Sequence, residues 1–222
     1  MAFQIEWIES QFFDPGKIAN QMIIVHHTGS NNGQVNSFEG TISWFKPATW
    51  RTYSQVSAQY IIAREERPIV QMVRDDDTAW HAGRSEWIID GHKYTELNNR
   101  SIGIELQGDG NLVGYTQFQY EALIWLIRQK MQKYNVPLEL VRGHQEISTQ
   151  KVDPGRLFDW NWVRNQLSSV SVNVPNTPPA DVVDSDNDGV VYTDPNHDVY
   201  IPDGRDRSLF GRIVEAIFSL FK

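Results

Sequence analysis

The chain has 222 residues, which is enough for one well-buried domain plus an appendage and short for two full domains. It has no cysteine, so a disulfide framework and a thiolate zinc site are excluded, and any metal must be held by His, Asp or Glu. The formal net charge of -8 argues against a nucleic-acid partner, because phosphate binding requires clustered Lys and Arg.

The amino terminus does not have the pattern of a secretory signal. Residues 1–10 carry Glu6 and Glu9 and no basic region ahead of an apolar one. No apolar run in the chain approaches membrane-spanning length. We therefore expect synthesis in the cytoplasm.

Several segments before residue 168 have the apolar patterning of strands. They are residues 21–26, 56–63, 69–73 and 101–106. The second and third are joined by Arg64-Glu-Glu-Arg-Pro68 and predict a hairpin. Residues 138–143, just before His144, read as a further extended segment.

Helical patterns lie between and after these strands. A weak one covers residues 37–45. A stronger helix is predicted from Thr116, because Thr116 and Gln119 have capping-box spacing and apolar residues follow at helical spacing. A third is expected over residues 157–167. The pattern predicts a mixed sheet flanked by helices, an α/β or α+β fold.

The composition changes after residue 168. Residues 169–183 are rich in Ser, Asn and Pro and read as an extended linker, which separates a domain over residues 1–168 from a segment over residues 184–222. That segment is acidic and ends in an apolar pattern from residue 207 that predicts an amphipathic helix. The helix can dock on the domain, pair in an oligomer or touch a membrane. Its few basic residues favour docking or self-association.

Asp184, Asp186 and Asp188 lie in a D-x-D-x-D-G sequence, which opens calcium-binding loops. The twelfth position is Pro195 and not the bidentate Glu of an EF-hand, and no flanking helices are evident. A looser calcium loop with Asp194 as an additional donor is one interpretation. A solvated acidic segment is the one we favour.

Two histidines and one aspartate stand where functional side chains are common, at the ends of extended segments. His26 ends an apolar strand, His144 follows another extended segment, and Asp153 lies nine residues after His144. Two imidazoles and a carboxylate form a common ligand set for catalytic zinc, with the fourth position left for water. The two histidines are far apart in sequence, so spacing alone leaves open that the three residues are unrelated.

A metal hydrolase also needs a proton acceptor and positive charge near the developing oxyanion. Glu105 is a carboxylate inside a short apolar strand, a costly position unless the group is paired, solvated in a cleft or functional. Lys151 lies two residues before Asp153, so a metal bound there would have its ammonium nearby. Taken singly, Lys151 is more simply read as a solvated loop lysine.

Five segments in this order resemble the type-2 N-acetylmuramoyl-L-alanine amidases, which are related to peptidoglycan recognition proteins and to phage lysozymes of amidase type. Each segment alone is a weak signal, and five in order over roughly residues 20–167 are a strong one. The segments are Ile23-Ile-Val-His-His-Thr-Gly29, residues 56–63, Ala79-Trp-His-Ala-Gly83, Asn98-Asn-Arg-Ser-Ile-Gly-Ile-Glu-Leu106, and residues 143–155.

The resemblance implies roles for particular residues. His26, His144 and Asp153 match the zinc ligands, in the branch that uses Asp where others use Cys. Glu105 matches the proposed general base and Lys151 the lysine thought to stabilise the oxyanion. Three residues match positions that line the peptide and muramyl cleft: Trp80, His81 and Asn98.

The chain also departs from the family pattern. Ala58 stands where some members have a Tyr near the zinc, which suggests the Glu-using branch. The stretch over residues 33–52 is longer than expected, and Glu65-Glu-Arg-Pro68 replaces the usual tight turn. His27, beside His26 on a strand, should face away from the metal and be structural.

The resemblance implies zinc-dependent hydrolysis of the amide bond between N-acetylmuramic acid and L-alanine of peptidoglycan. The alternatives are a peptidoglycan-binding module without activity, or a different zinc hydrolase on the same fold. The presence of all three proposed ligands favours catalysis. For the biological role, the appended segment favours a cell-wall-lytic endolysin, released through a holin, over a cytosolic wall-recycling amidase.

Overall fold

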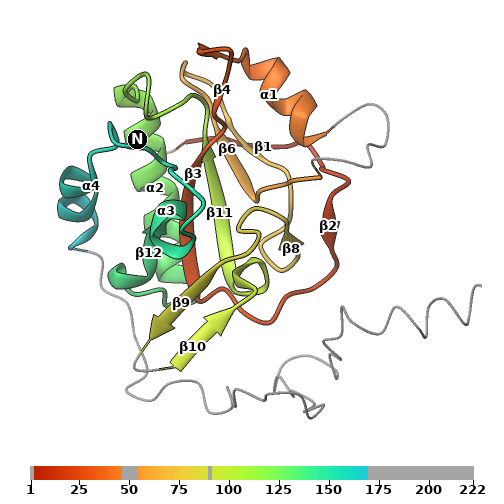
Figure 1. Cartoon of the computed structure of the whole chain (residues 1–222), viewed down its shortest axis with the longest axis vertical. Helices are drawn as coiled ribbons and strands as arrows, with labels where there is room; N and C mark the ends of the chain where they lie inside the picture. Colours follow the sequence, from red (N-terminus) through yellow and green to blue (C-terminus); the bar gives the residue numbers. More distant parts are fainter. Residues whose placement is uncertain (1–2, 47–54, 90–91, 170–222) are drawn as a thin grey trace, which may run out of the picture. The chain divides into compact units, whose positions relative to one another are not determined.

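The computed structural model of the chain describes residues 3–46, 55–89 and 92–169, and Figure 1 shows their arrangement. The proposed linker, the calcium loop and the C-terminal helix lie outside these residues. Within the described ranges, no helix is both long and apolar enough to cross a bilayer.

A six-stranded sheet forms the centre of the domain, with the strand order β1-β7-β6-β11-β3-β12 (Figure 1). β6 and β7 pair antiparallel, as the predicted hairpin requires, and the other neighbours pair in parallel. The strands are β1 (Ile5–Trp7), β3 (Met22–His27), β6 (Tyr60–Ile62), β7 (Ile69–Gln71), β11 (Ser101–Leu106) and β12 (Val141–Gly143).

Three short antiparallel pairs lie outside this sheet, and none of them was predicted from the sequence. They are β2 (Phe13–Asp14) with β8 (Thr78–Ala79), β4 (Ser30–Asn31) with β5 (Gln34–Val35), and β9 (Glu86–Ile89) with β10 (His92–Thr95). The β9–β10 hairpin projects below the sheet in Figure 1, at the end where β11 begins.

Helices cover both faces of the sheet. The described helices are α1 (Phe38–Phe45), α2 (Gln117–Tyr134), α3 (His144–Ile147) and α4 (Trp160–Leu167), with 3-10 turns η1 (Leu97–Arg100) and η2 (Leu138–Leu140). Phe38 and Phe45 of α1 join a buried cluster with Ile61 of β6. Lys130 of α2 contacts Tyr60, the neighbouring residue of the same strand. Because alternate strand residues face opposite sides, α1 and α2 lie on opposite faces.

A buried polar network ties α2 to β6 and to the segment after β7. Lys130 Nζ lies 2.6 Å from Asp75 Oδ2, and the hydroxyls of Tyr60 and Tyr134 donate to the same carboxylate at 2.7 and 2.8 Å. Burial opposes ionisation of Asp75, but the ammonium of Lys130 and these hydrogen bonds hold the pKa of Asp75 below its ordinary value. The carboxylate is therefore charged and fully paired.

The mixed α/β fold expected from the sequence is confirmed. The capping box of Thr116 and Gln119 starts α2, and β11 has the predicted bounds. The last helix was predicted to begin at residue 157 but begins at Trp160, where the Asp159 side chain accepts a hydrogen bond from the N–H of Trp162. The backbone before it is held in a turn, with the N–H of Leu157 bonded to a distant carbonyl.

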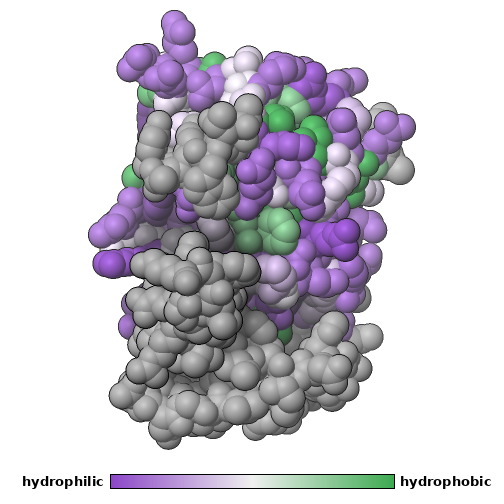
Figure 2. Space-filling view, turned by 90° about the vertical axis from the view of Figure 1, so that its right-hand side faces the viewer, coloured by the Kyte–Doolittle hydropathy of each residue, from purple (hydrophilic) through white to green (hydrophobic). Residues whose placement is uncertain are grey.

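The surface seen in Figure 2 is mainly hydrophilic, with apolar residues gathered in its middle and upper part. The apolar residues of the central strands are buried instead, and all six residues of β11 lie in the core. The polar side chains on such a strand are therefore the ones whose position calls for an explanation.

Candidate metal centre and catalytic site

The register of the sheet brings the proposed site together. Glu105 of β11 lies directly opposite His26 of β3 in a parallel pair, so the two side chains share one face. β12 pairs with the other side of β3, and its last residue, Gly143, lies opposite Val25. His144 follows at once and is level with His26. The site thus forms where three parallel strands end, the usual place for a ligand in such sheets.

His26, His144 and Asp153 converge as the sequence predicted, and they form a group that could hold a metal ion. The two Nδ1 atoms are 3.0 Å apart, and Asp153 Oδ2 lies 2.9 Å from the Nδ1 of His26 and 3.0 Å from that of His144. All three residues are buried, with exposed fractions of 1%, 3% and 7%.

The hydrogen bonds around this triangle favour metal binding. His144 Nε2 lies 3.1 Å from the carbonyl oxygen of Ala82, which can only accept, so this nitrogen carries the proton and Nδ1 has a lone pair. Burial lowers the pKa of His26 to about 4, so this ring is neutral. Burial raises the pKa of Asp153, but the imidazoles of His144 and His26 beside it outweigh this effect and hold the pKa below its usual range.

Three groups with lone pairs thus point at one another across about 3 Å. Neutral acceptors and a carboxylate this close repel unless a cation lies among them. Two imidazole nitrogens and one carboxylate oxygen are the donor set of many catalytic zinc sites. The residues present therefore fit zinc.

Glu105 is a buried carboxylate beside this cluster. It is 8% exposed, and its Oε2 has no hydrogen-bond partner within the described part of the chain. Burial raises the pKa of Glu105 well above its ordinary value; the charge of Asp153 adds to the rise and the charge of Lys151 opposes it. Such a carboxylate has a higher proton affinity than an exposed glutamate, a property that a general base requires.

Lys151 lies on the loop between α3 and Asp153, with its side chain exposed. Its charge is near enough to act on both His26 and Glu105. It therefore places a positive charge close to the cluster.

The three residues predicted to line the substrate cleft occupy different surroundings. Trp80 is half-buried, and its Nε1–H donates to Asp14 Oδ2 at 2.8 Å. His81 lies behind His26, with His81 Nδ1 3.0 Å from His26 Nε2. Asn98 Oδ1 accepts the backbone N–H groups of His81 and Ala82. Contact of these three residues with substrate stays a prediction.

His27 holds a neighbouring loop and lies apart from the cluster. Its Nδ1 accepts the N–H of Gly110 at 3.0 Å, and the carbonyl of Gly110 accepts the N–H of Leu157 at 2.9 Å. A Cβ on Gly110 would lie 1.9 Å from the carbonyl oxygen of Pro154, so only glycine permits this approach. The loop thereby holds the turn that carries Asp153, a role with no signal in the sequence.

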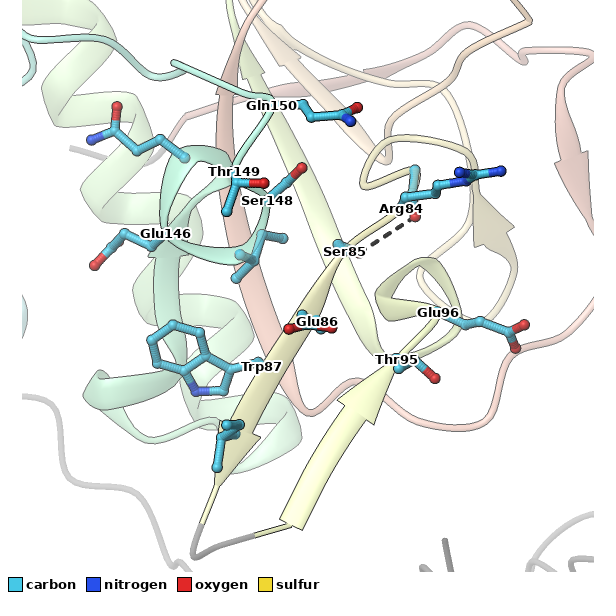
Figure 3. Close-up of a pocket in the computed structure, with 14 residues that line it drawn as sticks. Arg84, Ser85, Glu86, Trp87, Thr95, Glu96, Glu146, Ser148, Thr149 and Gln150 are labelled. Atoms are coloured by element: carbon cyan, nitrogen blue, oxygen red, sulfur yellow. Dashed lines mark hydrogen bonds between the residues drawn. The ribbon is translucent and has the colours of Figure 1, made fainter. Parts of the chain in front are cut away.

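A cavity of about 750 Å³ lies between Ser85 and β9 on one side and α3 with the following loop on the other (Figure 3). Trp87 of β9 lines the first side, and Glu146 of α3 with Ser148 and Thr149 of the loop line the second. The lining includes Gln145, next to His144 in the chain, but none of the proposed metal ligands. The volume is in the range of small-molecule pockets. The sequence did not predict this cavity, because its walls belong to the unpredicted hairpin and to a short helix.

Comparisons with known proteins agree with this geometry. The profile of the family described as N-acetylmuramoyl-L-alanine amidase matches residues 16–156. The 1,6-anhydro-N-acetylmuramyl-L-alanine amidase AmpD of Escherichia coli (strain K12) is 35% identical over 147 residues, which cover 66% of this chain and 72% of AmpD.

Two solved structures are also similar. The crystal structure of a selenomethionine AmpD derivative matches with a TM-score of 0.62 and 27% identity, over 75% of this chain and 96% of that one. The amidase AmiD from E. coli, in complex with the substrate anhydro-N-acetylmuramic acid-L-Ala-D-gamma-Glu-L-Lys, matches with a TM-score of 0.56 and 29% identity, over 72% and 60% of the two chains.

Proposed function

The chain belongs to the N-acetylmuramoyl-L-alanine amidase family and is an amidase, and from this we propose that it hydrolyses the bond between N-acetylmuramic acid and L-alanine in a zinc-dependent reaction. The observation that carries the proposal is the triangle of His26, His144 and Asp153. Its three potential ligand atoms lie within 3.0 Å of one another in a buried site, where a bound cation would remove the repulsion between them.

His26, His144 and Asp153 would hold the zinc. When bound there, zinc supplies Lewis acidity toward the scissile carbonyl and lowers the pKa of water. A calcium loop at Asp184, Asp186 and Asp188, the interpretation that the sequence analysis did not favour, has no support from the comparisons and is not part of this proposal.

Glu105 accepts the proton of the attacking water and returns it to the leaving amine of L-alanine. Its position opposite His26 and its raised pKa support this role. Lys151 stabilises the negative charge that develops on the carbonyl oxygen. The cavity between β9 and α3, lined by Gln145 and Gln150, the chain neighbours of His144 and Lys151, offers room for part of the muropeptide.

Two physical forms of the substrate are candidates. A cell-wall-lytic endolysin would cleave polymeric peptidoglycan, which the protein would reach after its release through a holin. The alternative is a soluble 1,6-anhydro muropeptide. The name of AmpD and the ligand of the AmiD complex favour this second candidate.

One experiment tests the chemistry and separates the substrates. The full chain is incubated with purified sacculi and, separately, with a soluble 1,6-anhydro muropeptide, and the products are identified by mass spectrometry. We expect free peptides with an L-alanine amino terminus, lost on chelation and restored by zinc. Turnover of sacculi supports the lytic role, and turnover of the soluble fragment alone supports recycling. Intact substrate in both incubations, with zinc bound to the protein, would instead indicate a peptidoglycan-binding module without activity.

A further inference from the structure

The loop from Trp80 to Gly83 lies directly behind both histidines of the metal cluster. His81 Nδ1 lies 3.0 Å from His26 Nε2, and the carbonyl oxygen of Ala82 lies 3.1 Å from His144 Nε2. Each histidine of the cluster therefore has its far ring nitrogen paired with an atom of this one loop.

The direction of the second of these contacts is determined by the carbonyl group. The oxygen of Ala82 can only accept, so His144 Nε2 must donate. His144 is consequently the tautomer with a proton on Nε2 and a lone pair on Nδ1, the atom that faces Asp153. A metal ligand requires that lone pair.

The direction of the first contact follows from a longer chain of hydrogen bonds. The hydroxyl of Ser101 donates to the carbonyl oxygen of Leu97, so toward His81 it offers a lone pair. His81 Nε2, 3.4 Å away, then donates to Ser101 Oγ, which leaves a lone pair on His81 Nδ1. This nitrogen accepts from His26 Nε2, so His26 also has its lone pair on Nδ1.

Two further features hold the loop in this place. Asn98 Oδ1 accepts the backbone N–H groups of His81 and Ala82 at 3.1 and 2.6 Å. Gly103 of β11 leaves room for the ring of His81, since a Cβ there would lie 2.5 Å from its nearest ring atom. The loop is thus fastened to both the sheet and η1.

We propose that His81 and Asn98 are positioning residues of the metal centre: His81 directly, and Asn98 through the loop, keep both metal-binding histidines as Nε2–H tautomers with their Nδ1 lone pairs free for zinc. This inference rests on the proposed zinc function. The inference places His81 behind the proposed metal site, where both of its ring nitrogens already have hydrogen-bond partners, His26 and Ser101.

The first test compares two substitutions whose side chains have the same number and branching of heavy atoms. His81→Asn keeps a side-chain oxygen able to accept from His26 Nε2, whereas His81→Leu keeps none. We expect His81→Leu to weaken zinc binding about 10- to 100-fold, measured by competition with a chromophoric chelator, and His81→Asn to stay close to the parent. Equal weakening in both variants, or none in His81→Leu, would overturn the proposal.

A second pair covers the case in which His81→Leu fails to fold. Ser101 and Ser10 are both buried serines, 0% and 1% exposed, whose hydroxyls donate to backbone carbonyls. We expect Ser101→Ala to weaken zinc binding and Ser10→Ala to lower only the melting temperature. Equal zinc affinity in these two variants would contradict the chain of hydrogen bonds through Ser101.

Nitrogen NMR of the imidazoles in the metal-free protein separates this inference from the proposed function. At a pH where every ring is neutral, we expect His26, His81 and His144 as Nε2–H tautomers, and loss of this signature for His26 in Ser101→Ala. A proton on Nδ1 of His26 or His144 in the parent would overturn the inference. Failure of the parent to bind zinc would instead refute the proposed function.

Discussion

Replacement of Glu105 by Gln separates proton transfer from metal binding. Gln has nearly the same shape, but it cannot accept the proton of the attacking water. We expect turnover to fall about 100- to 10,000-fold, the usual contribution of a positioned general base. That loss corresponds to about 2.7–5.5 kcal/mol of transition-state stabilisation. Zinc should stay bound, because the three proposed ligands are untouched.

The same substitution should stabilise the metal-free protein at neutral pH. The folded-state pKa of Glu105 is raised, so its ionised form opposes folding. This destabilisation is absent below the ordinary pKa of a glutamate. It grows as the pH rises from that ordinary value toward the raised pKa of the folded state. A neutral amide is cheaper to bury than a carboxylate. The advantage of Glu105→Gln in chemical denaturation should therefore disappear on acidification.

Glu66→Gln is the matched control, since Glu66 is an exposed glutamate in the turn between β6 and β7. It makes the same chemical change and should alter neither turnover nor stability measurably. Full activity in Glu105→Gln would remove Glu105 from the mechanism. If the Glu105→Gln protein were less stable than the parent at neutral pH, this would contradict the inference that Glu105 is a buried carboxylate whose ionised form destabilises the fold.

Four further predictions follow from the structure. His144→Ala should abolish stoichiometric zinc binding in metal analysis; retained zinc would exclude this ligand set. Gly110→Ala, which puts a methyl group 1.9 Å from the carbonyl oxygen of Pro154, should lower both zinc affinity and melting temperature. Asp75→Asn should lower the free energy of unfolding by about 3–5 kcal/mol at neutral pH. The loss should be smaller on acidification. A carboxylate with a lowered pKa stabilises the fold above its unfolded-state pKa and loses this effect as the pH falls. Deletion of residues 170–222 should leave a folded domain with a sharp thermal transition; an insoluble product would place that segment in the core.

The elements that the sequence predicted well depend on local interactions. The Thr116–Gln119 capping box and the helical spacing after it predicted α2, and a continuous apolar run predicted β11. Both signals lie within one element and need no knowledge of neighbouring elements.

The elements that were missed depend on distant partners. β1 is short and exposed, and it forms by pairing with β7. The β9–β10 hairpin is an exception, because its two strands are neighbours in the sequence, but each strand has only four residues. α4 begins later than predicted because Leu157 is bonded to Gly110, nearly fifty residues earlier in the chain.

The candidate site shows the same division. The resemblance of five segments to a known family was enough to select His26, His144 and Asp153, and the fold and family are confirmed. It could not show what lies behind these ligands, where the structure places His81 against His26, and Asn98 against the backbone of residues 81 and 82. The sequence by itself selected the candidate residues, because motifs preserve residue type and order. Tertiary structure decided the tautomers and the ligand geometry, because these depend on carbonyl and hydroxyl groups brought in from other strands and loops.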